Sequence, residues 1–460
     1  MEISNNYDFL ATALRQRRQK LATLINFPII LWSGRSISRN YPANTFPFRA
    51  SSHFLYFAGL PLENAAIRLE SGKLELFIDN AHPSNALWHG EMPKREEIAE
   101  KIGADAAFPM ADLESRTAGA ATIPVQDYRT LLKQSQTLNR PLPSAKSPEG
   151  IDLELTKAII SLRLTHDAAA LGELRQASAV TVEAHKVGMR ATASAKTESA
   201  IRAAMEGHII AENMTFAYPS IVTVRGEVLH NEQYHHPLQT GDLLLADVGA
   251  ETAMGWAGDV TRTWPVSGKF SPTQRDIYDV VLAAHDACIA KIVPGVEYRD
   301  IHLLAAQVIA EGLVDLGILQ GKPDDLVEMD AHALFFVHGI GHLIGLDVHD
   351  MEDFGDLAGY EEGRVRSSRF GLGYLRLHRT LRPGMLVSIE PGFYQVPGIL
   401  NKLENRSKYK DVVNWDKLNK FADVRGIRIE DDVLVTEAGT EILTANLPTH
   451  ADEIEQLVKG

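Results

Sequence analysis

Four carboxylate residues interrupt apolar, strand-like segments in the second half of this 460-residue chain. Asp247 follows the run LLLA, Asp259 lies in AGDVTRT, Glu390 interrupts LVSIEPGFY and Glu430 follows GIRI. Burying a carboxylate is expensive unless a metal ion or an opposite charge compensates it. A single one of these residues would be interpreted as outward-facing or ion-paired. Four in one domain need a common explanation, and a shared metal site provides one.

Three histidines occur within twelve residues of the segment FFVHGIGHLIGLDVHD, namely His338, His342 and His349. The spacing of the first two would place them on one face of a helix, but the glycines of the segment each oppose helix by about 1 kcal/mol. We therefore expect a glycine-rich loop whose backbone can approach an ion or a substrate closely. Core packing is a poor explanation, because each buried imidazole would need its own partner. Gly339 stands where a mononuclear zinc site of the H-E-x-x-H type needs its glutamate, which excludes that type.

The candidate ligands, four carboxylates and one imidazole, form a hard set rich in oxygen. Such a set suits Mn²⁺, or Zn²⁺ or Co²⁺ in a shared site, better than a closed structural zinc site. Two ions about 3.5 to 4 Å apart would activate a bridging water and stabilise a developing oxyanion. These residue types therefore indicate a hydrolase.

Length and charge limit the other possibilities. A chain of 460 residues exceeds what one hydrophobic core usually organises, so we expect two domains. With 45% hydrophobic and 23% charged residues, it has the composition of a globular protein. The formal net charge of -14 disfavours nonspecific binding to nucleic acid or anionic lipid, which both reward clustered Lys and Arg. We therefore expect neither nucleic acid nor a membrane as a partner.

The stretch PLPSAKSPEG, rich in Pro and Ser and without periodicity, indicates a linker between two domains. We place a smaller amino-terminal α/β domain at residues 1–160 and a larger domain at residues 161–460. Helical spacing of apolar residues predicts helices within residues 164–212, 272–292 and 298–317. Apolar runs predict strands in YPSIVTV, DLLLADVGAE, GDVTRTWPV, MLVSIEPGFY and GIRIEDDVLVTEAG.

The amino terminus and the cysteine content both bear on the cellular compartment. The first residues, MEISNNYDFL, lack the basic start and apolar stretch of a secretory signal. No later apolar run reaches the roughly 18 to 20 residues that a membrane span needs. Cys288, the single cysteine, cannot form an internal disulfide, and its helical context predicts a small buried hydrophobe rather than a reactive thiol. We therefore expect a cytoplasmic protein.

The motifs HGIGHLIGLDVHD, SIEPGFY and GIRIEDDVLVTEAG, in this order, resemble those of the pita-bread metallopeptidases, the superfamily of methionine aminopeptidase, aminopeptidase P and prolidase. The likeness extends across residues 160–450. It implies an α+β fold with a pita-bread catalytic domain and a dinuclear metal centre. The family's five ligands correspond to Asp247, Asp259, His342, Glu390 and Glu430. In the family, the positions of Asp259 and Glu430 bridge the two metals.

The amino-terminal domain favours the proline-directed branch of this superfamily. YPANTFPFRASSHFLYFAGL and NALWHGEM resemble the creatinase-like first domain of these members, which methionine aminopeptidases generally lack. The expected activity is hydrolysis of the bond before proline in short proline-containing peptides. The long interval from Glu390 to Glu430 and the position of Arg376, which matches an arginine that receives a dipeptide's carboxylate, resemble prolidase. An Xaa-Pro dipeptidase is therefore the main prediction, and an aminopeptidase P acting on longer peptides is the alternative.

The resemblance also implies catalytic roles. Glu390 would serve as a ligand and proton shuttle. His349 would polarise or stabilise the carbonyl oxygen, and His230 would contact the leaving side of the bond. His338 would line the pocket for proline.

Three further residues have weaker assignments. Arg428 would orient Glu430 or neighbouring ligands, and Tyr218 is a weaker candidate for a similar role. Trp88 is similar to an aromatic that, in some relatives, reaches a neighbouring subunit's active site, and a core tryptophan at a strand end is an equal alternative. Residues 401–424 are interpreted as a charged, solvated excursion between two strands.

Two rival classes share the fold. One is a non-catalytic module that holds peptides or proteins, whose members typically lose metal ligands. The other is a creatinase-like amidinohydrolase, which does not keep the full metal set. Because all five ligands are present, we expect an enzyme. As a separate expectation, the protein is a homo-oligomer, either a dimer or a tetramer.

One departure from the family pattern concerns the first two ligands. Eleven residues separate Asp247 from Asp259, one more than is usual in the family. A bulge at the tip of the hairpin would absorb the extra residue without moving either carboxylate.

Overall fold

A computed structural model describes the backbone of residues 2–460 and the side chains from Leu10 onward. Its internal contacts divide the chain into two compact units. The first unit runs to Leu171 and includes the short segments Ala253–Gly255 and Met351–Ala358. The second unit contains the remaining residues.

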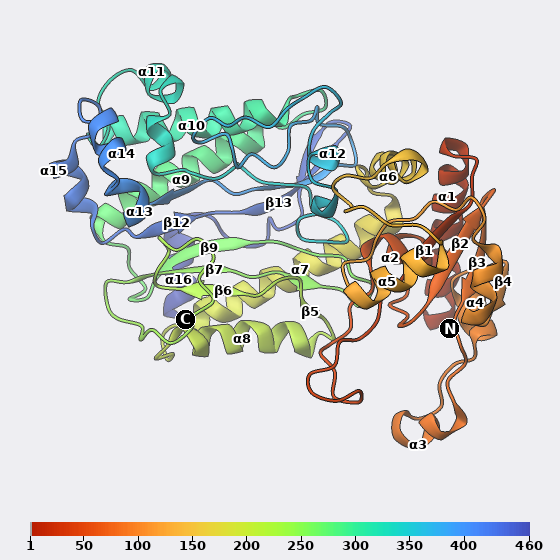
Figure 1. Cartoon of the computed structure of the whole chain (residues 1–460). Helices are drawn as coiled ribbons and strands as arrows, with labels where there is room; N and C mark the ends of the chain where they lie inside the picture. Colours follow the sequence, from red (N-terminus) through yellow and green to blue (C-terminus); the bar gives the residue numbers. More distant parts are fainter. Residues whose placement is uncertain (1) are drawn as a thin grey trace. The chain divides into compact units, whose positions relative to one another are not determined.

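The first unit is built on a four-stranded sheet in the order β1-β2-β3-β4 (Figure 1). β1, β2 and β3 pair in antiparallel fashion, and β4 joins β3 in parallel. A core cluster that includes Ile30, Trp32 and Phe77 covers the sheet. The strands are β1 (Ile29–Trp32), β2 (Ala66–Glu70), β3 (Lys73–Phe77) and β4 (Ala106–Phe108). The helices before residue 164 are α1 (Glu2–Leu24), α2 (Ser52–Ala58), η1 (Pro83–Asn85), α3 (Ala86–His89), α4 (Arg95–Lys101), η2 (Met110–Arg116), α5 (Tyr128–Thr137) and α6 (Gly150–Arg163).

The second unit contains four small sheets, β6-β7-β9, β10-β13-β14, β11-β12 and β5-β8. Every pairing within them is antiparallel. The strands are β5 (Thr215–Phe216), β6 (Ile221–Thr223), β7 (Leu243–Asp247), β8 (Ala250–Glu251), β9 (Thr261–Pro265), β10 (Leu386–Ile389), β11 (Gly392–Tyr394), β12 (Gly426–Arg428), β13 (Asp431–Thr436) and β14 (Gly439–Ile442).

Long helices flank these strands. In Figure 1 the strands β9, β12 and β13 run between the helices α9 and α10 on one side and α7 and α8 on the other. α9 begins with a capping box, in which Ser271 and Gln274 satisfy each other's backbone N–H groups. The helices after residue 164, long and short, are α7 (Ala168–Ala191), α8 (Glu198–Ala211), α9 (Pro272–Lys291), α10 (Tyr298–Asp315), α11 (Pro323–Glu328), η3 (Ala331–Leu334), α13 (Pro397–Leu400), α14 (Leu403–Lys408), α15 (Trp415–Leu418), η5 (Asn419–Phe421) and α16 (Ala451–Lys459). Two more, η4 (Glu352–Phe354) and α12 (Asp356–Gly359), begin in the segment Met351–Ala358 of the first unit.

The long elements follow the sequence expectations. The predicted helices correspond to α7, α8, α9 and α10, and Cys288 is fully buried in α9, where burial raises the pKa of its thiol. Across the described residues, none of the helices combines the length and the apolar character needed to traverse a bilayer.

Two predicted strands are each divided in two at a carboxylate. Glu390 lies between β10 and β11, and Glu430 lies between β12 and β13. β10 pairs with β13, whereas β11 pairs with β12. Both segments of the chain therefore pass from one sheet to the other at these residues. The break places both carboxylates at the same crossing point, where neither is committed to a regular strand face.

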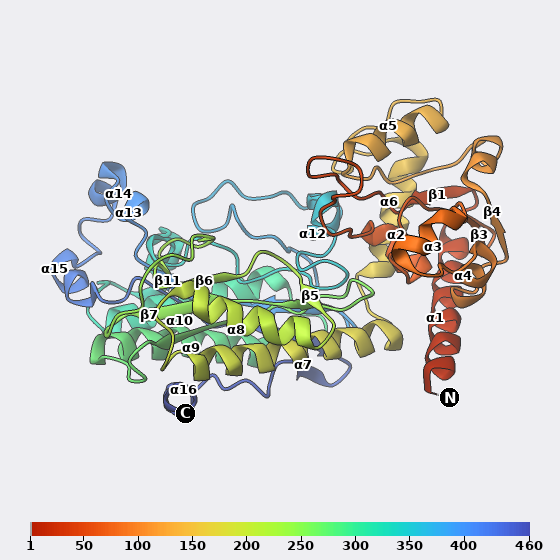
Figure 2. The same cartoon turned by 90° about the horizontal axis from the view of Figure 1, so that it is seen from below.

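The interpretation of residues 401–424 as a solvated excursion is wrong for part of the segment. Tyr409 is fully buried, and Leu418 and Phe421 are 4% and 2% exposed. The Tyr409 hydroxyl donates to the Met329 carbonyl at 3.1 Å. α13, α14 and α15 lie together in both views (Figures 1 and 2). The excursion is therefore a folded element with its own buried side chains.

Candidate active site

A cavity of about 620 Å³ in the second unit brings together most of the candidate residues. All five expected metal ligands line it, and so do all three candidate catalytic histidines. The predicted residues in its wall are Tyr218, His230, Asp247, Asp259, His338, His342, His349, Arg376, Glu390, Arg428 and Glu430. Trp88 is not among them.

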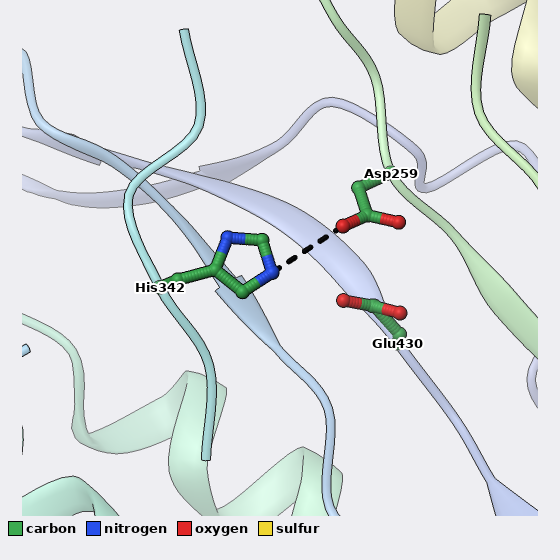
Figure 3. Close-up of side chains that lie close together, drawn as sticks. All are labelled: Asp259, His342 and Glu430. Carbon is green, nitrogen blue, oxygen red and sulfur yellow. Dashed lines mark ion pairs between the residues drawn. The ribbon is translucent and has the colours of Figure 1, made fainter. Parts of the chain in front are cut away.

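Three of the expected ligands converge closely. One donor atom from each of Asp259, His342 and Glu430 lies within 4.8 Å of the others, and all three side chains are buried. Figure 3 shows His342 on one side, with its ring directed toward the two carboxylates. The distance from His342 Nε2 to Asp259 Oδ2 is 3.4 Å. These residues can hold a metal ion.

The hairpin formed by β7 and β9 presents two carboxylates on one face. Asp247 is paired across the hairpin with Thr261, and Asp259 precedes Thr261 by two residues. Because side chains alternate along a strand, Asp247, Asp259 and Thr261 share a face. The pairing continues without a shift to the bond from Thr252 N–H to the Trp256 carbonyl. The pairing therefore leaves the tip at Ala253–Gly255, where Gly255 has φ +89°, as the place where an extra residue can be accommodated.

The loop that carries His342 depends on its glycines, as expected. His342 pairs with Ser388 of β10, donating its N–H to Oγ at 3.1 Å and accepting from the Ser388 N–H at 3.0 Å. Gly341 has φ +156°, and a Cβ at this position would lie 2.2 Å from the Ser388 carbonyl oxygen. Only glycine allows this approach.

The tautomer of His342 follows from its hydrogen bond. Nδ1 donates to the Leu343 carbonyl at 3.1 Å, which leaves the lone pair of Nε2 toward the carboxylates. Nε2 lies 3.8 Å from Glu390 Oε1, besides its contact with Asp259. A lone pair facing carboxylates is stable only if a proton or a cation lies between them. This arrangement fits a metal ligand.

The charges of the site also fit a cation. Burial, reinforced by neighbouring carboxylates, raises the pKa of Asp259, Glu390 and Glu430 well above their usual values. Arg428, and after it Arg376, lower the pKa of Glu390, but burial and the neighbouring carboxylates outweigh them. A bound divalent cation would favour the ionised carboxylates and reverse the direction of these shifts.

Arg428 and Tyr218 both hold Asp247. The Arg428 guanidinium is 3% exposed and donates to Asp247 Oδ2 at 2.6 Å, to Thr261 Oγ1 at 2.9 Å and to the Tyr394 hydroxyl at 3.0 Å. The Tyr218 hydroxyl lies 2.6 Å from Asp247 Oδ1 and 2.5 Å from Asp259 Oδ1. From the sequence, Arg428 is expected to orient Glu430 or a neighbouring ligand. The ligand that Arg428 contacts is Asp247, a neighbour of Glu430 in the site.

His338 belongs to the same hydrogen-bond network. Because the guanidinium of Arg428 can only donate, the Tyr394 hydroxyl accepts from it and donates to His338 Nε2 at 2.9 Å. Nδ1 then carries the proton and donates to the Gly339 carbonyl at 2.7 Å. Burial and the positive charge of Arg428 lower the pKa of His338 to about 3. The imidazole is therefore neutral at neutral pH.

The other two histidines lie at different depths. The ring of His349 lies 4.1 Å from that of His342, measured between centroids. His230 lies at the cavity wall and keeps much of its surface exposed. Its pKa is lowered, first by the burial of part of the ring and then by the positive charge of Arg428.

The two expected substrate-binding residues differ in position. Arg376 is half-buried and lines the cavity. Trp88 lies in α3 of the first unit and is 77% exposed, which excludes a core tryptophan. Leu87 beside it is 78% exposed. In Figure 1, α3 stands at the end of a long loop of that unit.

Sequence reasoning missed the apolar part of the cavity wall. Its members come from three separated segments, and each has the sequence context of an ordinary core residue. They include Ile221, Leu229, Val348, Val396 and Ile399.

Comparison with known families agrees with the geometry. Residues 172–437 match metallopeptidase family M24, and residues 14–124 match the aminopeptidase P N-terminal domain. A probable Xaa-Pro aminopeptidase of Fusarium vanettenii is 33% identical over 429 residues, covering 90% of this chain and 87% of that protein. One from Talaromyces stipitatus is 32% identical over 427 residues, covering 90% of this chain and 88% of its own.

Solved structures give the same result. Aminopeptidase PepP of Pseudomonas aeruginosa superposes with a TM-score of 0.80 at 28% identity and covers 98% of both chains. Zinc-substituted Escherichia coli aminopeptidase P in complex with product superposes with a TM-score of 0.77 at 26% identity, again over 98% of both chains. These matches confirm the predicted α+β architecture, a pita-bread catalytic domain preceded by a smaller creatinase-like domain.

The relatives named above are peptidases, and the prediction of an enzyme is confirmed over that of a non-catalytic binding module. Their names favour the alternative reading, aminopeptidase P, over the main prediction of a prolidase. The family and the site together also support the use of a metal. The chain belongs to metallopeptidase family M24 and is a metallopeptidase with an aminopeptidase P-type amino-terminal domain.

Proposed function

We propose that this metallopeptidase is an Xaa-Pro aminopeptidase, which releases the first residue from peptides whose second residue is proline. One observation carries the proposal. A single cavity gathers all five expected metal ligands, four carboxylates and the imidazole of His342, in a chain of which 90% aligns with a probable Xaa-Pro aminopeptidase. The first domain, at residues 1–160, and the catalytic domain, at residues 161–460, are parts of this proposal, as is residence in the cytoplasm.

Two divalent ions would be held by the five expected ligands, with Asp259 and Glu430 in the bridging positions. Mn²⁺ is the first candidate, and Zn²⁺ and Co²⁺ are alternatives for a set of oxygen and imidazole donors. When bound, such ions polarise the scissile carbonyl and lower the pKa of the attacking water. The full set is Asp247, Asp259, His342, Glu390 and Glu430.

The chain's own groups would handle the proton and the substrate. Glu390, whose carboxylate lines the cavity, is suited to take a proton from the attacking water and to pass it to the leaving nitrogen. His349 would donate to the carbonyl oxygen as negative charge develops there. His230 would contact the leaving side of the bond from the cavity wall. His338, neutral and fixed by Tyr394, would present its ring edge to the proline.

A dipeptidase remains a second candidate, because Arg376 lines the cavity. In that case its planar guanidinium would pair with the free carboxylate of the substrate's proline. Such a contact would fix where the substrate ends. A longer peptide has no carboxylate at that position and would not need the contact.

Hydrolysis of Ala-Pro-Ala and of Ala-Pro by the protein supplemented with Mn²⁺ distinguishes the two candidates. An aminopeptidase should have the higher kcat/KM on the tripeptide, and Arg376→Ala should change it little. A dipeptidase should prefer Ala-Pro, and Arg376→Ala should then cost about 2 to 4 kcal/mol in kcat/KM, with Arg376→Lys a partial rescue. Faster cleavage of the dipeptide together with this loss would replace the proposal by the prolidase reading.

The oligomeric state also belongs to the proposal. We propose a homo-oligomer, a dimer or a tetramer, in which exposed Trp88 reaches the active site of a neighbouring copy. Light scattering gives the mass of the assembly. Trp88→Ala should raise KM for peptide in the oligomer if this contact exists.

A further inference from the structure

Residues 401–424, the excursion described above, are held together by their own contacts. The guanidinium of Arg406 lies 3.6 Å from the ring centroid of Trp415. The Gln395 amide, just before the excursion, donates to the carbonyls of Phe421 and Val424 at 2.7 and 2.9 Å. These bonds close the excursion at its base. With Tyr409 fully buried, the segment is a rigid support rather than a loose loop.

This support fixes α13, the short helix that reaches the cavity. The side chain of Asn405 donates to the Ile399 carbonyl at 2.9 Å, and Arg406 Nε donates to the Leu400 carbonyl at 2.7 Å. Both bonds satisfy carbonyls at the end of α13, which a helix of this length cannot satisfy internally. Ile399 is half-buried and lines the cavity. The excursion therefore holds one apolar side chain at the substrate site.

Ile399 completes an apolar wall, formed by Ile221, Leu229, Val396 and Ile399. Leu229 and Val396 pack against the buried cluster that contains Ile221. Ile221 is the direct partner of Asp247 in the pairing of β6 with β7. The apolar wall thus stands beside the carboxylate end of the cavity.

The charges of the cavity orient a peptide relative to this wall. The substrate of an aminopeptidase carries a free α-ammonium group, which is attracted to the carboxylates. His349 and Arg376 belong to other segments of the lining, whereas Arg428 donates to Asp247 Oδ2 at 2.6 Å. Because Ile221 is the strand partner of Asp247, a peptide whose ammonium group lies near Asp247 places the side chain of its first residue against the apolar wall.

We propose that the excursion is a specificity element: through Ile399 it makes the enzyme select peptides with a large apolar residue before proline. This inference rests on the proposed function, because it assigns the subsite of that same cavity. Apolar surface buried against the wall favours Leu or Phe over Gly at the first position. A pocket of this kind discriminates through the carbon atoms that it contacts.

The test compares kcat/KM for Leu-Pro-Gly and Gly-Pro-Gly in the wild type, Ile399→Ala and Ile399→Trp. The wild type should prefer the leucine peptide. Ile399→Ala should lower the ratio of the two values by about tenfold, since the contact with the substrate side chain is lost. Ile399→Trp, which fills the space, should lower it further or reverse it. Leu403→Ala is the matched control, because Leu403 lies in the excursion and is 84% exposed.

Several outcomes would overturn the inference. One is a ratio that stays unchanged in both Ile399 variants while their melting temperatures match the wild type. Another is that the Ile399 variants change only the preference between Leu-Pro-Leu and Leu-Pro-Gly, which differ after the proline. The apolar wall would then contact the leaving side of the bond instead of the first residue. A wild type that cleaves no Xaa-Pro peptide removes the proposed function and this inference together. A wild type that cleaves both peptides but prefers glycine removes the inference alone.

Discussion

Replacing Arg428 by methionine tests how far the metal site depends on one buried cation. The guanidinium makes three hydrogen bonds, of which the shortest, at 2.6 Å, holds Asp247. Methionine fills a similar volume and removes all three. Leaving one member of a buried ion pair alone costs about 3 to 5 kcal/mol. In the metal-free protein, this cost should appear as a lower free energy of unfolding.

Metal binding should suffer as well. Arg428 keeps Asp247 in one orientation, and the loss of such a support typically lowers metal affinity by about 10- to 100-fold. Titration of metal-stripped protein with Mn²⁺ in a calorimeter measures this change. Arg425→Met is the matched control, because Arg425 is 42% exposed and pairs with Glu227 at 3.5 Å, so its loss should change unfolding by less than about 0.5 kcal/mol. Wild-type Mn²⁺ affinity in Arg428→Met would refute the reasoning.

Three other predictions follow from the same geometry. Gly341→Ala should lower the free energy of unfolding by about 3 kcal/mol or more, because Gly341 has a positive φ and the added Cβ would collide with Ser388. Gly398→Ala should not lower it, because the space around Gly398 is open. Denaturant titration of the two variants measures the difference. Asp259→Ala should abolish turnover with the fold intact, and retained activity in excess Mn²⁺ would contradict a bridging role. Burial lowers the pKa of His302 to about 4, so the folded state resists protonation and stability should fall as the pH drops from about 6.5, by about 2 kcal/mol at pH 5. His302→Gln should remove this contribution and leave that of other buried histidines such as His185, whose pKa burial also lowers to about 4.

The positions of the five candidate ligands could be predicted because their chemistry is conspicuous. A carboxylate such as Asp247 or Glu430, next to an apolar strand, costs too much to be buried without a purpose. The glycines around His342 are visible for a similar reason, since glycine opposes regular structure. Both signals are local in the sequence. Neither depends on knowing which segments meet.

The partners of these residues could not be predicted in the same way. Arg428 and Asp247 are 181 residues apart, and their contact exists only because β12 and β7 meet in the folded unit. The apolar wall is harder still, because Ile221 and Ile399 look like any core isoleucine. The preference for prolidase rested on the length of the excursion and on Arg376, and neither feature identifies the subsite that it serves. The buried side chains of the excursion were likewise hard to predict, because they stand among charged residues in the sequence.

The hairpin between the first two ligands shows why spacing along the chain is a weaker constraint than register. Asp247 and Asp259 reach the same site because they lie on one face of an antiparallel pair. A shift of one residue within that pair would turn Asp259 to the opposite face and remove it from the site. An extra residue can therefore be accommodated only beyond the paired segment, which here is the tip at Ala253–Gly255. The distance between ligands in sequence is free to vary, provided that the pairing beneath them stays the same.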